Sequence, residues 1–79
     1  MATQIKPTLS TIERLLEEVE EYSGRFQKIR QKLNRLRRGS QAYLDLLPDV
    51  EVALDVLRSK AAHAHEALEE FEESLTDAE

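Results

Sequence analysis

The 79-residue sequence has no cysteine, no tryptophan, two glycines and two prolines. Without cysteine, neither a disulfide nor a thiolate-bound metal holds the fold together. Few glycines and prolines, with 34% charged residues, are typical of exposed helices and atypical of strands. No stretch approaches the ~20 apolar residues of a membrane-spanning helix, and the N-terminal residues show no apolar leader. We therefore expect an all-α protein that is soluble and cytoplasmic.

Small size and uneven charge also bear on the class of protein. A chain this short buries a small core, so association with another chain is the expected source of added stability. The net charge is −5, yet the segment between Tyr22 and Leu44 holds seven basic residues and no acidic one. After Lys60 the sequence holds seven acidic residues and no lysine or arginine. The chain is therefore divided into blocks of opposite charge.

The strongest positive signal is a heptad repeat. With Ile12 at position a, residues at positions a and d recur in alternating steps of three and four up to Leu75, and nearly all are apolar. This spacing places them on one side of a helix, where they must be buried against another helix. Apolar residues beside this row widen it, at Leu9 and Leu16 in the first half and at Leu46 in the second. A row this wide is typical of a helix bundle.

Capping residues predict where the helices begin and end. Ser10 and Glu13 have the spacing of a capping box at the start of a first helix. Gly39 follows a run of arginines and is predicted to end that helix in the left-handed conformation, with Ser40 as a possible new cap. Pro48 is tolerated in a first helical turn, so we predict that a residue shortly before it, Asp45, caps the second helix.

These signals predict one helical-hairpin domain over residues 9–76. The map is a frayed segment at 1–8, a helix at about 9–38, a turn at 39–47, a helix at about 46–75 and an acidic tail at 77–79. The helices are of similar length, and antiparallel folding pairs residues whose numbers sum to about 87. The heptad register crosses the turn without interruption, so one long kinked helix is the alternative. We favour the hairpin because glycine costs about 1 kcal/mol and proline about 3 kcal/mol inside a helix.

Charge placement predicts how two hairpins associate. With the predicted pairing, acidic residues 13–21 lie beside acidic residues 66–79, and the two segments repel. A second hairpin with its turn at the opposite end brings the basic segment 25–38 beside those acidic ends. We therefore expect an antiparallel homodimer that forms a four-helix bundle. The layout and length resemble those of small hairpin dimers such as the plasmid RNA-binding bundle Rop, a likeness of architecture without a shared motif.

The predicted protein–protein interface consists of heptad residues and their apolar neighbours. It would bury them against a second copy or against another helical protein. These residues are Ile12, Leu16, Val19, Tyr22, Phe26, Ile29, Leu33, Leu36, Leu46, Val50, Leu54, Leu57, Leu68 and Phe71.

The basic segment suggests an alternative function. Positive side chains spaced along one helix are suited to follow a phosphate backbone. The candidate nucleic-acid contacts are Arg25, Lys28, Lys32, Arg35 and Arg38. Aromatic residues are not interleaved with them, and the protein is negative as a whole, so nucleic-acid binding ranks below protein binding.

No residue pattern predicts catalysis. His63 and His65 are two positions apart on a helix and point about 200° away from each other, so they do not share a metal. His65 and Glu69 have helical i, i+4 spacing but lack further ligands. The sequence contains neither a nucleophilic triad pattern nor a glycine-rich phosphate loop. We expect a non-enzymatic interaction, scaffold or adaptor module without a cofactor, with a nucleic-acid-binding bundle as the alternative.

Overall fold

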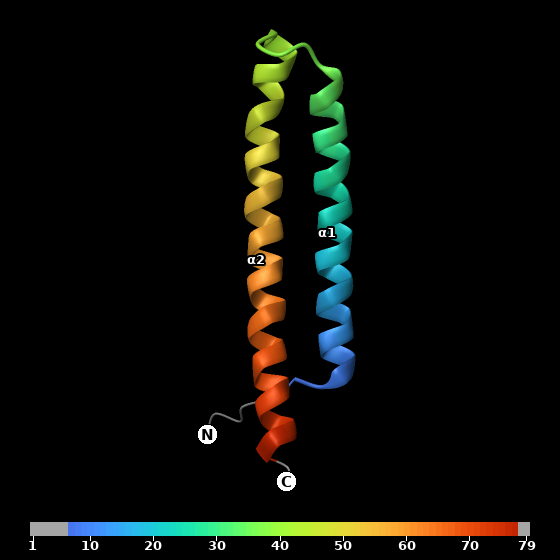
Figure 1. Cartoon of the computed structure of the whole chain (residues 1–79), viewed down its shortest axis with the longest axis vertical. Coiled ribbons are helices and arrows are strands. Elements are labelled where there is room, and N and C mark those ends of the chain that lie inside the picture. The colour runs from blue at the N-terminus through green and yellow to red at the C-terminus, as the bar shows by residue number, and fades with distance from the viewer. Residues whose placement is uncertain (1–6, 78–79) are drawn as a thin grey trace.

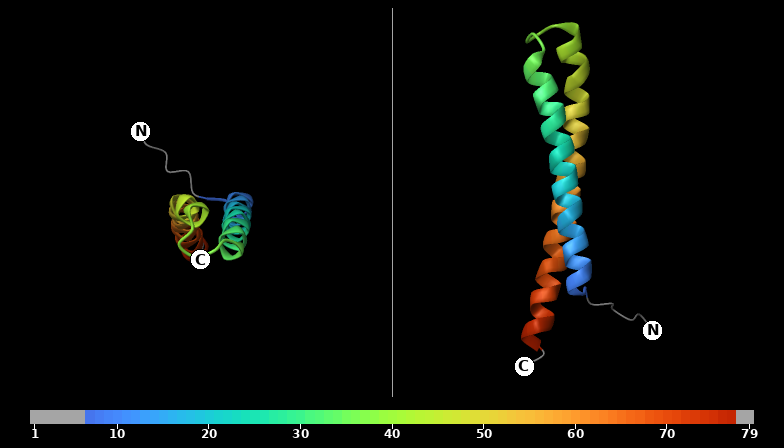
Figure 2. Two further views of the ribbon diagram at one scale, coloured as in Figure 1. Left: turned by 90° about the horizontal axis from the view of Figure 1, so that it is seen from above. Right: turned by 90° about the vertical axis from the view of Figure 1, so that its right-hand side faces the viewer.

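The computed structural model describes residues 7–77 as a hairpin of two helices. Helix α1 spans Leu9–Arg35 and α2 spans Gln41–Asp77. The two run antiparallel and pack along the length of α1, as Figure 1 shows. The molecule is 59 Å long and 15 Å across its thinnest direction, and the views in Figure 2 show its rod shape. The all-α hairpin is therefore confirmed, and the continuous kinked helix is wrong.

The structure describes only the inner residues of the two predicted terminal segments. The frayed segment at 1–8 lies outside the described residues except for positions 7 and 8, and the acidic tail lies outside them except for Asp77. Thr8 caps α1, and Asp77 is the last residue of α2. These two residues therefore belong to the hairpin.

Helix α1 begins at a different cap from the predicted one. Thr8 has an extended backbone, and its Oγ1 accepts a hydrogen bond from the Thr11 N–H at 3.2 Å. Its carbonyl also accepts the Ile12 N–H at 3.0 Å, the first helical bond. Ser10, the predicted cap, lies inside the first turn. Thr8 is also a good cap residue and lies directly after Pro7, so the helix begins after Thr8 and includes Ser10.

Helix α1 also ends three residues earlier than predicted. Leu36 adopts an extended backbone and donates its N–H to the Leu33 carbonyl at 3.1 Å. Gly39 has the expected positive φ of 83°, but it lies inside the following turn instead of directly behind the helix. The Ser40 N–H closes that turn on the Arg37 carbonyl at 3.0 Å.

Helix α2 begins at Gln41, five residues before the predicted position 46. The Ser40 Oγ accepts the Tyr43 N–H at 3.2 Å, so the possible new cap is confirmed. Asp45 is not a cap: it lies inside the helix and accepts a hydrogen bond from Gln41 Nε2 at 2.7 Å. Ser40 and Asp45 are both suitable cap residues, and the helix begins directly after the earlier of the two.

Pro48 lies inside α2 instead of in its first turn. Proline has no N–H, so the Leu44 carbonyl loses the partner that the helix would normally provide four residues later. Leu44 and Pro48 are both exposed, which lets water reach that carbonyl. Exposure near the start of the helix limits the cost of this interruption.

A shorter turn changes which residues face each other. Lys60 Nζ lies 3.6 Å from Glu18 Oε2, and Tyr22 lines the same hollow as Val56, so facing residues have numbers that sum to 78. The predicted sum of about 87 is wrong because the turn occupies residues 36–40 instead of 39–47. The predicted repulsion between segments 13–21 and 66–79 is also wrong, since the first segment faces residues such as Lys60.

The core is narrow and lies between the two helices. Only four apolar residues among those described are buried, with exposed fractions of 4–7%: Ile12, Leu15, Leu46 and Ala64. In α1 the half-buried heptad residues occupy positions a and d, as expected. In α2 the inward side consists mainly of positions d and g. Among the position-a residues, Leu47 and Leu68 are half-buried, whereas Leu54 and Leu75 are exposed. The helix is therefore rotated away from the predicted contact.

Candidate interaction surfaces

The structure divides the predicted interface residues into an inner and an outer set. Most are buried or half-buried and contribute to the packing of α1 on α2 within one chain. This inner set comprises Ile12, Val19, Tyr22, Phe26, Ile29, Leu33, Leu36, Leu46, Val50, Leu57, Leu68 and Phe71. Leu16 and Leu54 form the outer set and are 44% and 46% exposed. Only this outer set is largely available to another molecule.

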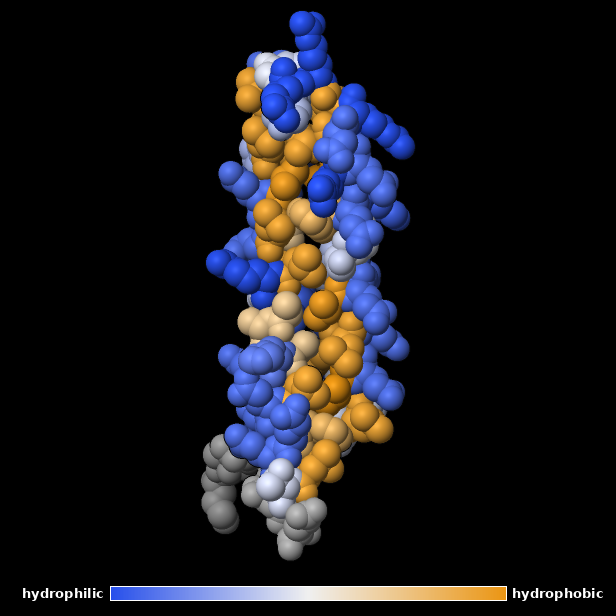
Figure 3. Space-filling view, in the orientation of Figure 1, coloured by the Kyte–Doolittle hydropathy of each residue, from blue (hydrophilic) through white to orange (hydrophobic). Residues whose placement is uncertain are grey.

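Five exposed leucines lie on one face of the hairpin, which we call the open apolar face. Leu9, Leu16 and Leu44 occupy position e, and Leu54 and Leu75 occupy position a. Because positions d and g of α2 point inward, position a of α2 and position e of α1 flank the contact on the same side, and position e of α2 lies next to them, farther from α1. Figure 3 shows this side as an apolar strip that runs the length of the molecule along the line between the helices. Hydrophilic side chains border the strip on both edges.

Three of the five leucines were missing from the predicted interface. Leu9 was visible in the sequence as an apolar position e, and Leu75 as the last member of the heptad row. Leu44 also occupies position e, but it lies in the predicted turn at 39–47 and therefore outside both predicted helices. Neither periodicity nor spacing revealed that α2 is rotated, which exposes Leu54, or that α2 extends past the start of α1, which leaves Leu75 uncovered.

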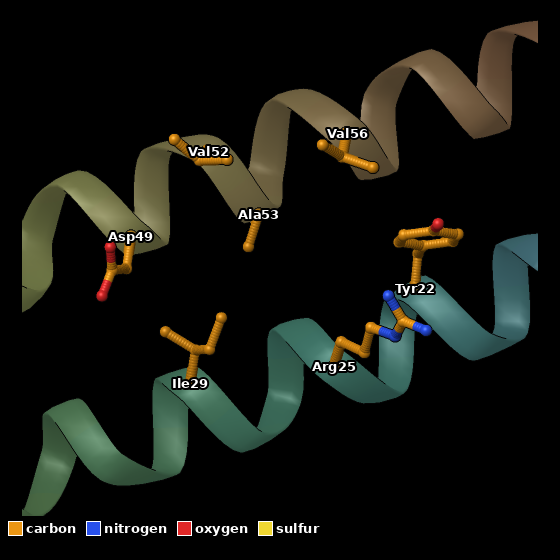
Figure 4. Close-up of a pocket in the computed structure, with 7 residues that line it drawn as sticks. All are labelled: Tyr22, Arg25, Ile29, Asp49, Val52, Ala53 and Val56. Atoms are coloured by element: carbon orange, nitrogen blue, oxygen red, sulfur yellow. The ribbon is translucent and has the colours of Figure 1, made fainter.

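A hollow of about 330 Å³ lies on the opposite side of the hairpin. Its floor is mainly apolar and includes Ile29, Ala53 and Val56, as Figure 4 shows. Arg25 and Asp49 add opposite charges to its lining. Val52, which is 62% exposed, also borders it. The hollow is open to solvent and of a size to receive one or two apolar side chains.

A cluster of polar contacts lies beside this hollow, and one of its members, Lys60, joins the two helices. Arg25 forms an ion pair with Glu21 at 2.6 Å, and its guanidinium carbon lies 4.6 Å from the centre of the Tyr22 ring. Lys60 Nζ lies 5.2 Å from the same ring and pairs with Glu18 across the helices. Because lysine reaches both an aromatic face and a carboxylate, this cluster favours the observed register over neighbouring ones.

The predicted nucleic-acid contacts differ in how far they are engaged. Arg25 is occupied by the contacts just described, whereas Lys28, Lys32 and Arg35 are exposed. None of these three forms an ion pair within residues 7–77. The helical spacing places them with Arg25 along one side of α1, away from the open apolar face, and we call these four residues the basic stripe. Arg38 lies in the turn.

The histidines form no metal-binding group in the described part of the chain. His65 Nδ1 lies 3.0 Å from Glu69 Oε1, and both side chains are exposed. No set of three or more histidine, cysteine, aspartate or glutamate side chains among the residues searched is placed to hold a metal ion. Neither helix, over its described residues, combines the length and apolar character needed to cross a bilayer.

Comparisons with known proteins do not assign the chain to a family. No family model, no curated protein and no solved structure matches it. The function must therefore be inferred from the surfaces themselves.

Proposed function

We propose that this chain is a non-enzymatic protein–protein interaction module, a scaffold or adaptor, whose open apolar face docks on helices. The docked helices belong to a second copy or to another helical protein. The observation that supports this proposal is the row of five leucines with exposed fractions of 44–58% on one face. Soluble monomers rarely leave an apolar patch of that length uncovered.

The energetics of the monomer point the same way. Burying a leucine fully contributes about 1.5–3 kcal/mol, so covering five half-exposed leucines contributes several kcal/mol. The hairpin alone buries only four apolar residues in its described part. Domains of this size generally need oligomerisation or another added constraint. Docking on the open apolar face provides the missing burial.

Substitutions on the two sides of α2 test the proposal. Leu54 lies on the open apolar face, whereas Val52 is more exposed but lies on the side of the hollow. We expect Leu16→Glu and Leu54→Glu to weaken self-association at least tenfold in sedimentation equilibrium, because each places a charge in an apolar contact. We expect the matched control Val52→Glu to leave association unchanged. Circular dichroism checks that each variant remains helical.

The same variants extend the test to other partners. Each tagged variant is incubated with lysate of the source cells after nuclease treatment, and the bound proteins are compared. Proteins retained by the wild type and by Val52→Glu but lost with Leu16→Glu support docking on a helical partner. Equal binding by all variants, together with a wild-type monomer of 9.1 kDa at tens of micromolar, contradicts the proposal.

The basic stripe supports a second candidate function, binding of nucleic acid. Lys28, Lys32 and Arg35 are exposed and lack intramolecular ion pairs within the described residues, and Arg25 and Arg38 extend the positive surface. Under this alternative, Lys28→Glu with Arg35→Glu abolishes binding of a labelled RNA or DNA duplex in fluorescence anisotropy. Binding also weakens steeply as salt rises, because counterions are released. Absence of binding by the wild type at low salt excludes this alternative.

Charge reversal in the basic segment separates the two functions. Arg35→Glu with Arg38→Glu is expected to weaken dimerisation if these residues face the acidic end of a second copy. Under nucleic-acid binding, the same variant still dimerises and loses only its ligand. Sedimentation equilibrium of the protein without nucleic acid distinguishes these results.

A further inference from the structure

The C-terminal end of α2 extends beyond α1. Helix α2 has 37 residues and α1 has 27. Because facing residues have numbers that sum to 78, Leu9 at the start of α1 lies level with residue 69. Residues 70–77 therefore project past the start of α1, as Figures 1 and 2 show, and we call them the overhang. The heptad row continues along it with Phe71 and with Leu75, which is 58% exposed.

The overhang carries negative charge at the wrong end of a helix. Glu70, Glu72 and Glu73 are exposed and form no ion pair within residues 7–77. The last turn of α2 contains no basic residue. Carboxylates near a helix C-terminus interact unfavourably with the partial negative charge of that end, by about 0.3–1 kcal/mol for each close group. A positive surface placed beside the overhang removes this cost.

The turn at the other end of the hairpin has the complementary character. Arg37 and Arg38 are exposed there, and neither forms an ion pair within the described residues. The first turn of α2 contains no acidic residue, so its positive helix end is also uncompensated. Leu36 and Leu44 add apolar surface at the turn, half-buried and exposed respectively. Neither set of charges is close to the other within one chain, because they lie at opposite ends of a 59 Å rod.

We propose that the open apolar face docks on the same face of a second copy in antiparallel orientation, with the overhang of each chain covering the turn of the other. This inference rests on the proposed function and names its partner. A two-fold axis across the helices stacks α2 on α2 and brings the acidic C-terminal end beside the partner's arginines. A face 59 Å long has room for the ~800 Å² per partner of a stable interface. With the two turns at the same end, the acidic overhangs would instead lie beside each other and the basic turns would also lie beside each other.

Cysteine cross-linking tests the orientation, and the chain offers a clean background because it has no cysteine. Full overlap places the turn of one copy level with the end of the other, so paired α2 positions sum to about 117. Gln41 of one chain then lies near Thr76 of the partner, and both are exposed. A mixture of Gln41→Cys and Thr76→Cys chains, one of them tagged, is oxidised under mild conditions. We expect the mixed disulfide to dominate over both self-linked products.

Dominant self-linked products overturn the antiparallel proposal while leaving the open apolar face in use. Failure of the proposed function looks different, since Leu54→Glu then has no effect on association. The second-copy proposal is also overturned if the wild-type chain is monomeric and binds a different protein that the Leu54→Glu variant does not bind. In that case the proposed function stands. Val52→Cys mixed with Thr76→Cys is the matched control, and it is expected to form little mixed disulfide.

A charge swap tests the contact between overhang and turn. One chain carries Arg37→Glu and Arg38→Glu, and the other carries Glu72→Lys and Glu73→Lys. Each chain alone is expected to dimerise at least about tenfold more weakly at low salt, because four charge pairs become repulsive. Mixing the two chains restores association, and added salt reduces the difference. Equal dissociation constants for the swapped chains and the wild type overturn the contact.

Discussion

The two glycines of the chain provide a direct test of the hairpin, because the same substitution has opposite effects at each. A Cβ added at Gly24 or at Gly39 meets no atom within 4 Å, so packing does not confuse the comparison. Gly24 lies inside α1, whereas Gly39 has a φ of 83°. The difference between the variants therefore reports the backbone conformation alone.

The expected magnitudes follow from backbone preferences. Alanine is about 1 kcal/mol more favourable than glycine inside a helix, so Gly24→Ala is expected to stabilise by about that amount. An L-residue in the left-handed region costs about 1–2 kcal/mol, so Gly39→Ala is expected to destabilise by that amount. For a protein of this size, 1 kcal/mol corresponds to about 4–8 °C in Tm. The two variants should thus differ by about 2–3 kcal/mol in stability, or roughly 8–24 °C in Tm.

The assay is urea and thermal unfolding followed by circular dichroism. Protein concentration is held equal for all samples, because any dimer makes apparent stability depend on concentration. A stabilising Gly39→Ala refutes the turn, since in a continuous helix both glycines would gain from alanine. A destabilising Gly24→Ala refutes the assignment of its surroundings as open space.

Two further substitutions test the helix interruption and the register. Pro48→Ala is expected to stabilise by about 1–3 kcal/mol in urea unfolding, because it restores an N–H to the Leu44 carbonyl within α2; a loss of stability would show that the proline is required for the local conformation. A double-mutant cycle with Glu18→Ala and Lys60→Ala should give a coupling energy of about 0.2–1 kcal/mol. Because solvent reaches both side chains, added salt should reduce this coupling energy. A coupling energy of zero at low salt would contradict the observed register.

Local signals in the sequence accounted for the helices and for part of the turn. The heptad row predicted two helices packed along their length, because a seven-residue repeat is legible within one helix. Gly39 and Ser40 also took the predicted roles, since backbone freedom and side-chain capping depend on near neighbours. The inner set of apolar residues followed from the same periodicity.

Competition between equally good caps limited what the sequence determined about the ends of the helices. Thr8 displaced Ser10, and Ser40 displaced Asp45, because each pair offers two side chains able to accept the same kind of hydrogen bond. Which cap is used depends on how the rest of the chain packs. Each choice is worth about 1 kcal/mol, so small differences in packing decide it.

The sequence by itself determined that helices form and which side of each is broadly apolar. Only the tertiary structure decided that residues summing to 78 face each other, that α2 is rotated so that positions d and g point inward, and that Leu54 and Leu75 remain outside. Register and rotation depend on contacts between segments far apart in the sequence. A turn shortened by a few residues therefore shifts every pair along the hairpin, whereas periodicity within either helix is unchanged.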